Sequence, residues 1–166
     1  MNQPSQQQIQ ALLKLYNEGN LTAALEQAEK LISRFPQSFA LHSLCGAIHQ
    51  GLHQYQPASK EFKRALAIDP DRPDTHYNLG VALEAQGQDE PAIRSYQRAI
   101  ELNPQQASAL TNLAFLTKRA GDKEKAVELY QRALNLRPDD PKILYHIGLL
   151  FAEESDNEGE IGRAHV

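Results

Sequence analysis

The stretch PDTHYNLGVALEAQGQDEPAIRSYQRAIELNP, residues 73–104, decides the fold of this chain. Its first half carries apolar and small residues at the spacing of one helix face, and this stripe stops at Gly87. Its second half carries another such stripe, which starts at Ala92 and is closed by Pro104. Because glycine and proline end helices, the stretch predicts two helices joined by a short turn.

The same pattern recurs every 34 residues on both sides of this stretch. Prolines stand at Pro36, Pro70, Pro104 and Pro138, and alanines stand at Ala24, Ala58, Ala92 and Ala126. A further site keeps a small residue at Gly46, Gly80, Ala114 and Gly148, and another keeps an aromatic residue at Phe62, Tyr96 and Tyr130. The chain is therefore predicted to be a tandem array of helix pairs, in which small residues let the paired helices approach closely.

These residues resemble the signature of the tetratricopeptide repeat, a 34-residue unit with Leu-Gly, an Ala, an aromatic residue, an Ala and a Pro at fixed positions. With Pro36 at position 32 of its unit, the units are 5–38, 39–72, 73–106 and 107–140, and a half repeat covers 141–154. The resemblance implies an all-α fold, a right-handed α-solenoid of helix-turn-helix repeats over residues 1–154. The first unit departs from the pattern, as expected of a cap, because Leu12 stands at the small position and Ala28 at the aromatic one.

Composition limits the classes of function. The net charge of −4 argues against nucleic acid as a partner. The most apolar run, ILYHIGLLFA at 143–152, is about half of the length that crosses a bilayer, so no membrane association is predicted. A single cysteine and an N-terminus without a secretory signal favour a cytoplasmic protein. Neither a phosphate loop nor a catalytic motif is visible, so no cofactor and no enzymatic activity are predicted for these residues.

One short motif, LHSLCGAIHQG at 41–51, invites a metal-site interpretation. His42, Cys45 and His49 share one face of a helix, and two imidazoles with a thiolate are ligands that zinc accepts. In the repeat frame the three residues fall at positions 4, 7 and 11, which pack the first helix of a unit against its second helix. We therefore favour packing over metal binding, and no metal ligand is predicted.

The resemblance also implies a concave groove, lined by one side of the first helices, that binds a partner protein or peptide. At 100° per residue, positions 2, 5, 9, 12 and 13 lie together on that side. Position 6 carries an asparagine in two units, which suits the donors and acceptors of an extended peptide. The candidate groove residues are Tyr77, Asn78, Val81, Thr111, Asn112, Phe115, Lys118, Arg119, Lys142, Tyr145, His146 and Leu149. The competing interpretation is that neighbouring helices cover part of this band, and the oligomeric state stays open.

The C-terminal segment 155–166 is expected to be a disordered or artefactual tail. Its last six residues, IGRAHV, are those that one reading frame of a common sequencing adapter encodes. A truncated gene is therefore expected, and the alternative function is the N-terminal targeting arm of a larger bacterial enzyme. Loose similarity to the leading repeats of such proteins suggests a sulfotransferase, an O-linked glycosyltransferase or a 2-oxoglutarate oxygenase as the enzyme type.

Overall fold

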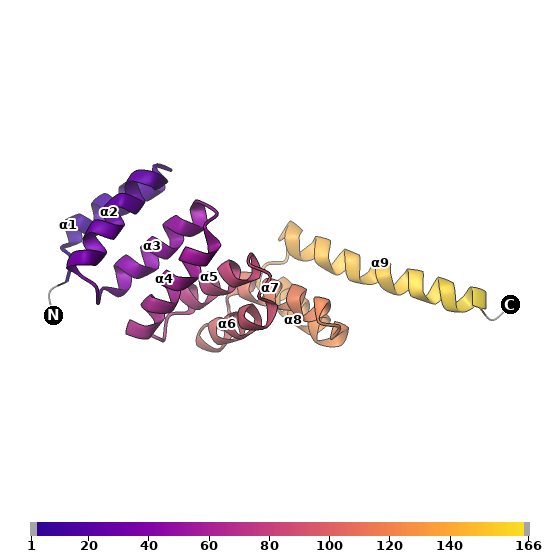
Figure 1. The fold of residues 1–166 in the computed structure, drawn as a ribbon. Helices are drawn as coiled ribbons and strands as arrows, with labels where there is room; N and C mark the ends of the chain where they lie inside the picture. Colours follow the sequence, from indigo (N-terminus) through magenta and orange to yellow (C-terminus); the bar gives the residue numbers. More distant parts are fainter. Residues whose placement is uncertain (1–2, 165–166) are drawn as a thin grey trace. The chain divides into compact units, whose positions relative to one another are not determined.

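A computed structural model describes residues 3–164 of the chain, with side chains described from 3 to 152. In this part the regular secondary structure is entirely helical (Figure 1). The helices are α1 (Gln6–Asn17), α2 (Leu21–Arg34), α3 (Phe39–Gly51), α4 (Tyr55–Ile68), α5 (Pro73–Glu84), α6 (Asp89–Leu102), α7 (Ala107–Arg119), α8 (Lys123–Leu136) and α9 (Pro141–Ala164). The predicted all-α fold of repeated helix pairs is confirmed.

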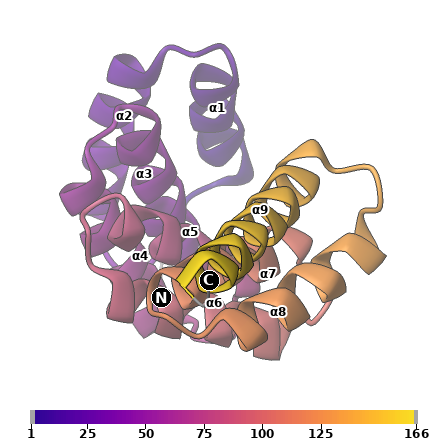
Figure 2. The ribbon, with the colours of Figure 1, turned by 90° about the vertical axis from the view of Figure 1, so that its right-hand side faces the viewer.

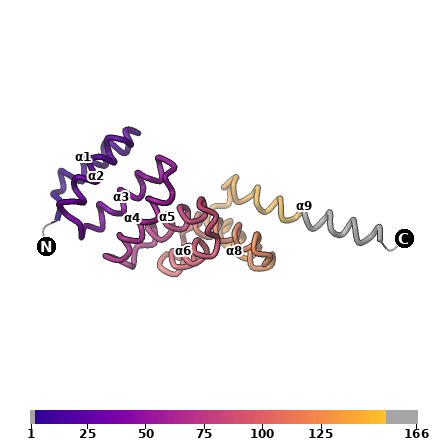
Figure 3. The backbone as a smooth tube through the Cα atoms, in the orientation of Figure 1, coloured from indigo at the N-terminus to yellow at the C-terminus, as the bar shows by residue number. Residues whose placement is uncertain are grey.

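The helices divide into two compact units, which are described separately. Unit 1, Met1–Leu102, holds α1 to α6, and unit 2, Asn103–Val166, holds α7 to α9. Within unit 1 the chain reverses direction at each short turn (Figure 3), and α3 packs on α4 as α5 packs on α6. Within unit 2, α7 packs on α8 and α8 contacts α9 (Figure 2). The repeated unit of packing is thus a pair of antiparallel helices.

Local signals explain where the helices begin and turn. The Ser5 hydroxyl accepts from the backbone N–H of Gln8, whose side chain accepts from the backbone of Ser5, and this capping box starts α1. The turns inside three of the pairs use glycine at positive φ, at Gly19, Gly87 and Gly121. In the remaining pair His53 takes the same conformation, with φ of 58°, which histidine adopts more readily than most residues. All four turns therefore keep one geometry.

The tight crossings predicted from the small residues are present in unit 1. A Cβ built on Gly46 would lie 2.7 Å from the ring of Phe62, and one on Gly80 would lie 2.5 Å from the ring of Tyr96. In the first pair the sizes are reversed, because Leu12 on α1 and Ala28 on α2 occupy the equivalent positions and both are fully buried. A helix pair therefore closes with one large and one small side chain at this point, whichever helix supplies the large one.

Candidate functional site

The predicted groove residues fall on both units. Unit 1 carries Tyr77, Asn78 and Val81 on α5. Unit 2 carries the others, on α7 and α9: Thr111, Asn112, Phe115, Lys118, Arg119, Lys142, Tyr145, His146 and Leu149. We call the side of the first helices that carries positions 5, 6 and 9 the first-helix face, and describe it for each unit by itself.

Aromatic rings connect α7 to α9 in unit 2. The ring centroid of His146 lies 5.4 Å from that of Phe115 and 5.6 Å from that of Tyr130 on α8, with which it stacks. Tyr145 meets the same imidazole edge-on at 5.6 Å. Such ring pairs are attractive beyond the area they bury. His146 is therefore the centre of the cluster and fixes this side of α9.

Cations surround the aromatic cluster. The Lys142 ammonium donates to Oδ1 of Asn112 at 2.9 Å, and the Arg119 guanidinium lies 5.4 Å from the centre of the Phe115 ring. Burial lowers the pKa of His146 below its ordinary value, and the charges of Lys142 and Lys118 lower it further. The imidazole is thus held neutral near pH 7, and the positive charge of the site comes from its lysines and arginine.

Two apolar side chains of the cluster face solvent. Tyr145 is 64% exposed and Leu149, one helical turn further along α9, is 38% exposed. Thr111 is buried instead, and its hydroxyl donates to the carbonyl of Ala107 one turn earlier in α7. The exposed part of the predicted set in unit 2 therefore consists of an apolar pair flanked by cations.

The predicted residues of unit 1 border a different kind of surface. The Tyr77 ring is 5.9 Å from that of Tyr96, and Val81 is half-buried. Asn78 lines a pocket of about 270 Å³ together with Tyr16, Ala47, Gln50 and Gly51. The side-chain oxygen of Gln50 is buried, and no hydrogen-bond partner for it occurs among the described residues. The pocket is thus lined in part by the small residues Ala47 and Gly51, and the Gln50 oxygen can accept a hydrogen bond within it.

The histidine and cysteine motif of α3 is built into the packing of α3 on α4. His42 Nδ1 lies 2.7 Å from Oε2 of Glu61, and its Nε2 donates to the Pro36 carbonyl at 2.9 Å. Burial raises the pKa of the Cys45 thiol to about 12, and the charge of Glu61 adds to the rise. His49 Nδ1 bonds the side chain of Gln54 at 2.7 Å. Each residue therefore has a packing or hydrogen-bonding role, as the repeat frame predicts.

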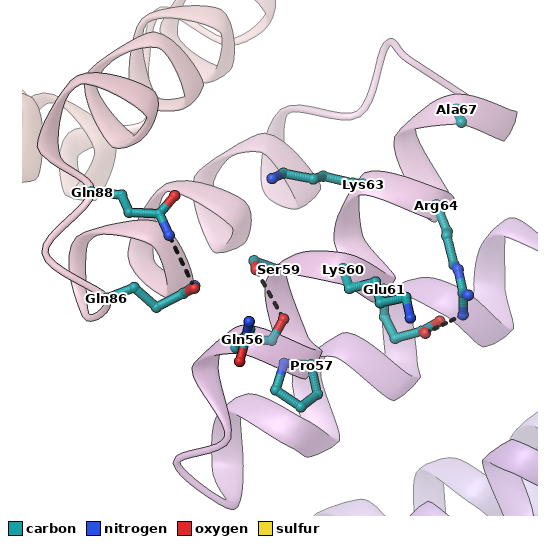
Figure 4. A pocket seen from close by; sticks show the side chains of 10 residues that line it. All are labelled: Gln56, Pro57, Ser59, Lys60, Glu61, Lys63, Arg64, Ala67, Gln86 and Gln88. Carbon is teal, nitrogen blue, oxygen red and sulfur yellow. Dashed lines mark hydrogen bonds and ion pairs between the residues drawn. The ribbon is translucent and has the colours of Figure 1, made fainter.

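A pocket that the sequence analysis missed lies on the second-helix side of unit 1 (Figure 4). It measures about 800 Å³ and is lined mainly by α4, with Gln86 and Gln88 from the turn after α5. Lys60, Lys63 and Arg64 give it positive charge, although the carboxylate of Glu61 pairs with Arg64 at 2.6 Å. The run KEFKR at 60–64, with its cations at i, i+3 and i+4, is the signal that could have indicated it.

The described residues lack two further kinds of feature. They contain no group of three or more histidine, cysteine, aspartate or glutamate side chains placed to hold a metal ion. None of the helices, over the part that the structure describes, is long and apolar enough to cross a membrane.

Comparison with protein families gives one consistent match. A model described as tetratricopeptide repeat matches residues 73–106, and another of the same description matches 95–128. A model described as TPR repeat matches 53–87 and 119–154. Together the matches run without a gap from 53 to 154, and the first coincides with the third predicted unit.

Individual proteins are similar over shorter or more divergent stretches. Superkiller complex protein 3 of Homo sapiens is 35% identical over 65 residues, which are 39% of this chain and 4% of that protein. The chain thus spans a small fraction of that relative. A structure of MamA from Desulfovibrio magneticus RS-1 is 25% identical with a TM-score of 0.74, over 81% of this chain and 76% of that one. A Pseudomonas aeruginosa PilF structure is 23% identical with a TM-score of 0.79, over 90% and 68%.

Proposed function

The chain belongs to the tetratricopeptide repeat family, and we propose that it binds a partner polypeptide through the first-helix face of its repeats. The family supports a general role as a protein-interaction scaffold. The alternative of a targeting arm for an enzyme gains no support from the comparisons. The proposal assigns this chain a binding role without a catalytic step.

One observation carries the proposal in unit 2. Tyr145 and Leu149 are exposed side by side on α9, next to a ring cluster that already holds their helix in place. An exposed tyrosine on a rigid base is a typical anchor of a binding interface, because it buries a large area at a small loss of conformational entropy. The partner segment is therefore expected to bring apolar side chains to this pair.

The charges around the pair indicate what flanks the anchors in the partner. Lys118, Arg119 and Lys142 lie on the same face, and Lys142 bonds a neutral amide. An acidic side chain of the partner would meet attractive potential there, which raises the association rate more than the final affinity. We propose a segment with one or two apolar anchors followed by an acidic group.

The pocket of unit 1 supports the same mode of binding at a second place. The unpartnered Gln50 oxygen can accept from a backbone N–H, and the Asn78 amide beside it can both donate and accept. The small residues Ala47 and Gly51 leave room for a polypeptide backbone to approach. We propose that this pocket binds backbone groups of the partner, whereas Tyr145 and Leu149 of unit 2 bind its side chains.

In the first step of the test, peptides that bind the full chain are selected from a displayed library of random peptides. Affinity of the selected peptides is then measured by calorimetry. The double variant Tyr145→Ala with Leu149→Ala should weaken binding at least about tenfold, since each anchor carries on the order of 1–2 kcal/mol. Glu128→Ala, on the exposed side of α8, is the matched control and should bind like the parent. If only the Glu128 variant loses binding, the partner uses the second-helix side and the proposal fails.

A further inference from the structure

A hollowed surface on the second-helix side of unit 1 lies apart from the first-helix face. The pocket of about 800 Å³ beside α4 (Figure 4) is one part of it. A second hollow, of about 420 Å³, is lined mainly by α5 and α6 and shares Lys63 and Gln88 with the first. We call the two hollows together the α4–α6 groove. The residues that line it include none of those predicted for the first-helix face.

Positive charge prevails in the α4–α6 groove. Its lining residues, all in the described part of the chain, include one carboxylate, that of Glu61, and five lysines and arginines, which are Lys60, Lys63, Arg64, Arg94 and Arg98. Both oxygens of Glu61 are already engaged, one by Arg64 at 2.6 Å and the other by His42 at 2.7 Å. The groove therefore has more cations than its own carboxylate can neutralise.

Three of these cations can bind a ligand without breaking an existing ion pair. Arg64 pairs with Glu61, and Arg98 pairs with two carboxylates outside the groove, each at 3.0 Å. The exposed cations for which no ion pair to another described residue occurs are Lys60, Lys63 and Arg94. Lys60 and Lys63, three residues apart on α4, are neighbours on one helix face and repel each other. An anionic group bound between them would remove this repulsion.

The polar walls of the groove suit a polypeptide ligand. Figure 4 shows Lys63 extending from α4 toward the side that carries Gln86. The Gln86 amide donates to the carbonyls of Tyr55 at 3.0 Å and of Ala82 at 2.7 Å, so this wall is held in place before a ligand binds. The Gln56 amide has no hydrogen-bond partner among the described residues. It can therefore both donate to a peptide carbonyl and accept from a peptide N–H.

We propose that the α4–α6 groove binds an acidic segment of a partner polypeptide. Carboxylates of the segment pair with Lys60 and Lys63 in the first hollow and with Arg94 in the second, and one segment can occupy both hollows because they share Lys63. Gln56 bonds its backbone. A nucleic acid fits this groove less well, because the net charge of −4 on the chain repels a long phosphate backbone beyond the groove.

The experiment uses a fluorescent hexaglutamate peptide and follows its binding to the full chain by anisotropy at low and at physiological salt. We expect saturable binding, which the double variant Lys60→Gln with Lys63→Gln should weaken at least about fivefold at low salt. Lys14→Gln with Lys30→Gln is the matched control, because it removes the same charge from exposed cations of α1 and α2 that line neither hollow. The control should change the affinity less than about twofold.

Four outcomes would overturn the proposal. The first two are the absence of saturable binding and equal weakening by both double variants, which would mean that net charge alone attracts the peptide. In the third, Lys118→Gln with Arg119→Gln removes binding and the groove variant keeps it, which would place the peptide on unit 2. In the fourth, a single-stranded oligonucleotide of equal charge competes better than unlabelled hexaglutamate, which would assign the groove to nucleic acid.

The variant Tyr145→Ala with Leu149→Ala separates this inference from the proposed function. It should leave hexaglutamate binding intact, because neither residue lines the α4–α6 groove. The two tests can therefore fail independently of each other. Circular dichroism of each variant checks that the fold is kept.

Discussion

Helices α5 and α9 carry similar residues at the same repeat positions, yet one is covered and the other is open. Leu83 at position 11 of α5 is 2% exposed, whereas Phe151 at position 11 of α9 is 62% exposed. Gly80 meets the ring of Tyr96, whereas Gly148 meets nothing within 4 Å among the described residues. The pattern of a helix therefore predicts which side is suited to packing, and the presence of a partner decides whether that side contributes to stability.

The largest contrast is expected in thiol chemistry at position 7. Cys45 of α3 has a buried thiol whose pKa is raised to about 12, so its thiolate fraction at pH 8 falls roughly a thousandfold below that of an ordinary cysteine. In a Cys45→Ser background, Ile147→Cys would place a thiol at the same repeat position of α9, where the native side chain is only half-buried. Reaction with an aromatic disulfide reagent should be at least about tenfold slower for Cys45 than for the introduced thiol.

A control in the unfolded chain completes this comparison. In denaturing urea both thiols should react at similar rates, because the difference belongs to the folded chain. Equal rates in the folded proteins would mean that position 7 of α9 is as covered as position 7 of α3.

Truncation at position 11 comes next in size. Leu83→Ala should lower the free energy of unfolding by about 2–5 kcal/mol, because it leaves a cavity in a closed helix pair. Phe151→Ala removes a larger side chain, yet it should change stability by no more than about 0.5 kcal/mol since the ring is mainly in solvent. Urea unfolding followed by circular dichroism measures both. A loss of several kcal/mol for the Phe151 variant would contradict the exposure of this ring.

Substitution of Gly80 and of Gly148 by alanine should change the free energy of unfolding in opposite directions. Gly80→Ala places a methyl group 2.5 Å from the fully buried ring of Tyr96, so it should cost about 1–3 kcal/mol. Gly148→Ala meets no heavy atom within 4 Å in the described part of the chain and adds helix propensity, so it should stabilise the protein by about 0.5–1 kcal/mol. The midpoints of thermal and urea unfolding measure both the expected loss and the expected gain of stability. Two destabilising results would indicate that Gly148 is needed against another group.

The smallest effect concerns the covered side of α9. Burial first, and then the charges of Lys142 and Lys118, lower the pKa of His146. The unfolded chain thus takes up this proton at higher pH than the folded one, and the free energy of unfolding falls as pH drops below about 6.5. His146→Gln should reduce the difference between the urea midpoints at pH 7.5 and pH 5.5. A variant with the parent's full pH dependence would place the effect on other groups.

The repeat period made the fold predictable from the sequence. Pro36, Pro70 and Pro104 fix the register, and the small residues at Gly46 and Gly80 fix the closest approach of the paired helices. Both signals are local or strictly periodic, so they can be recognised in the sequence without knowledge of the tertiary contacts. The roles of Cys45 and His42 followed from the same register, because a packing position constrains a side chain whatever its chemistry.

The candidate site was less predictable, because it depends on side chains that meet across helices. The bond from Lys142 to Asn112 joins residues 30 apart in the sequence, and the spacing along either helix does not indicate it. The large pocket beside Lys63 was missed, because the periodic pattern directed attention to the first helices. Angular spacing along one helix indicates which side of the helix a residue occupies. The hydrogen bonds of a long side chain also depend on the neighbouring helices, whose positions this spacing does not give.

The two histidines at position 4 of unit 1 have a mechanical consequence. His42 donates to the Pro36 carbonyl and His76 bonds the Pro70 carbonyl at 2.8 Å, so each ties the start of one repeat to the end of the repeat before it. At the joint before α9 the same position holds Leu144, whose hydrocarbon side chain cannot donate to a carbonyl. Under tension along the chain, we expect this joint to open at lower force than the two histidine-tied joints, so that α9 would be released while those earlier repeats still bear the load.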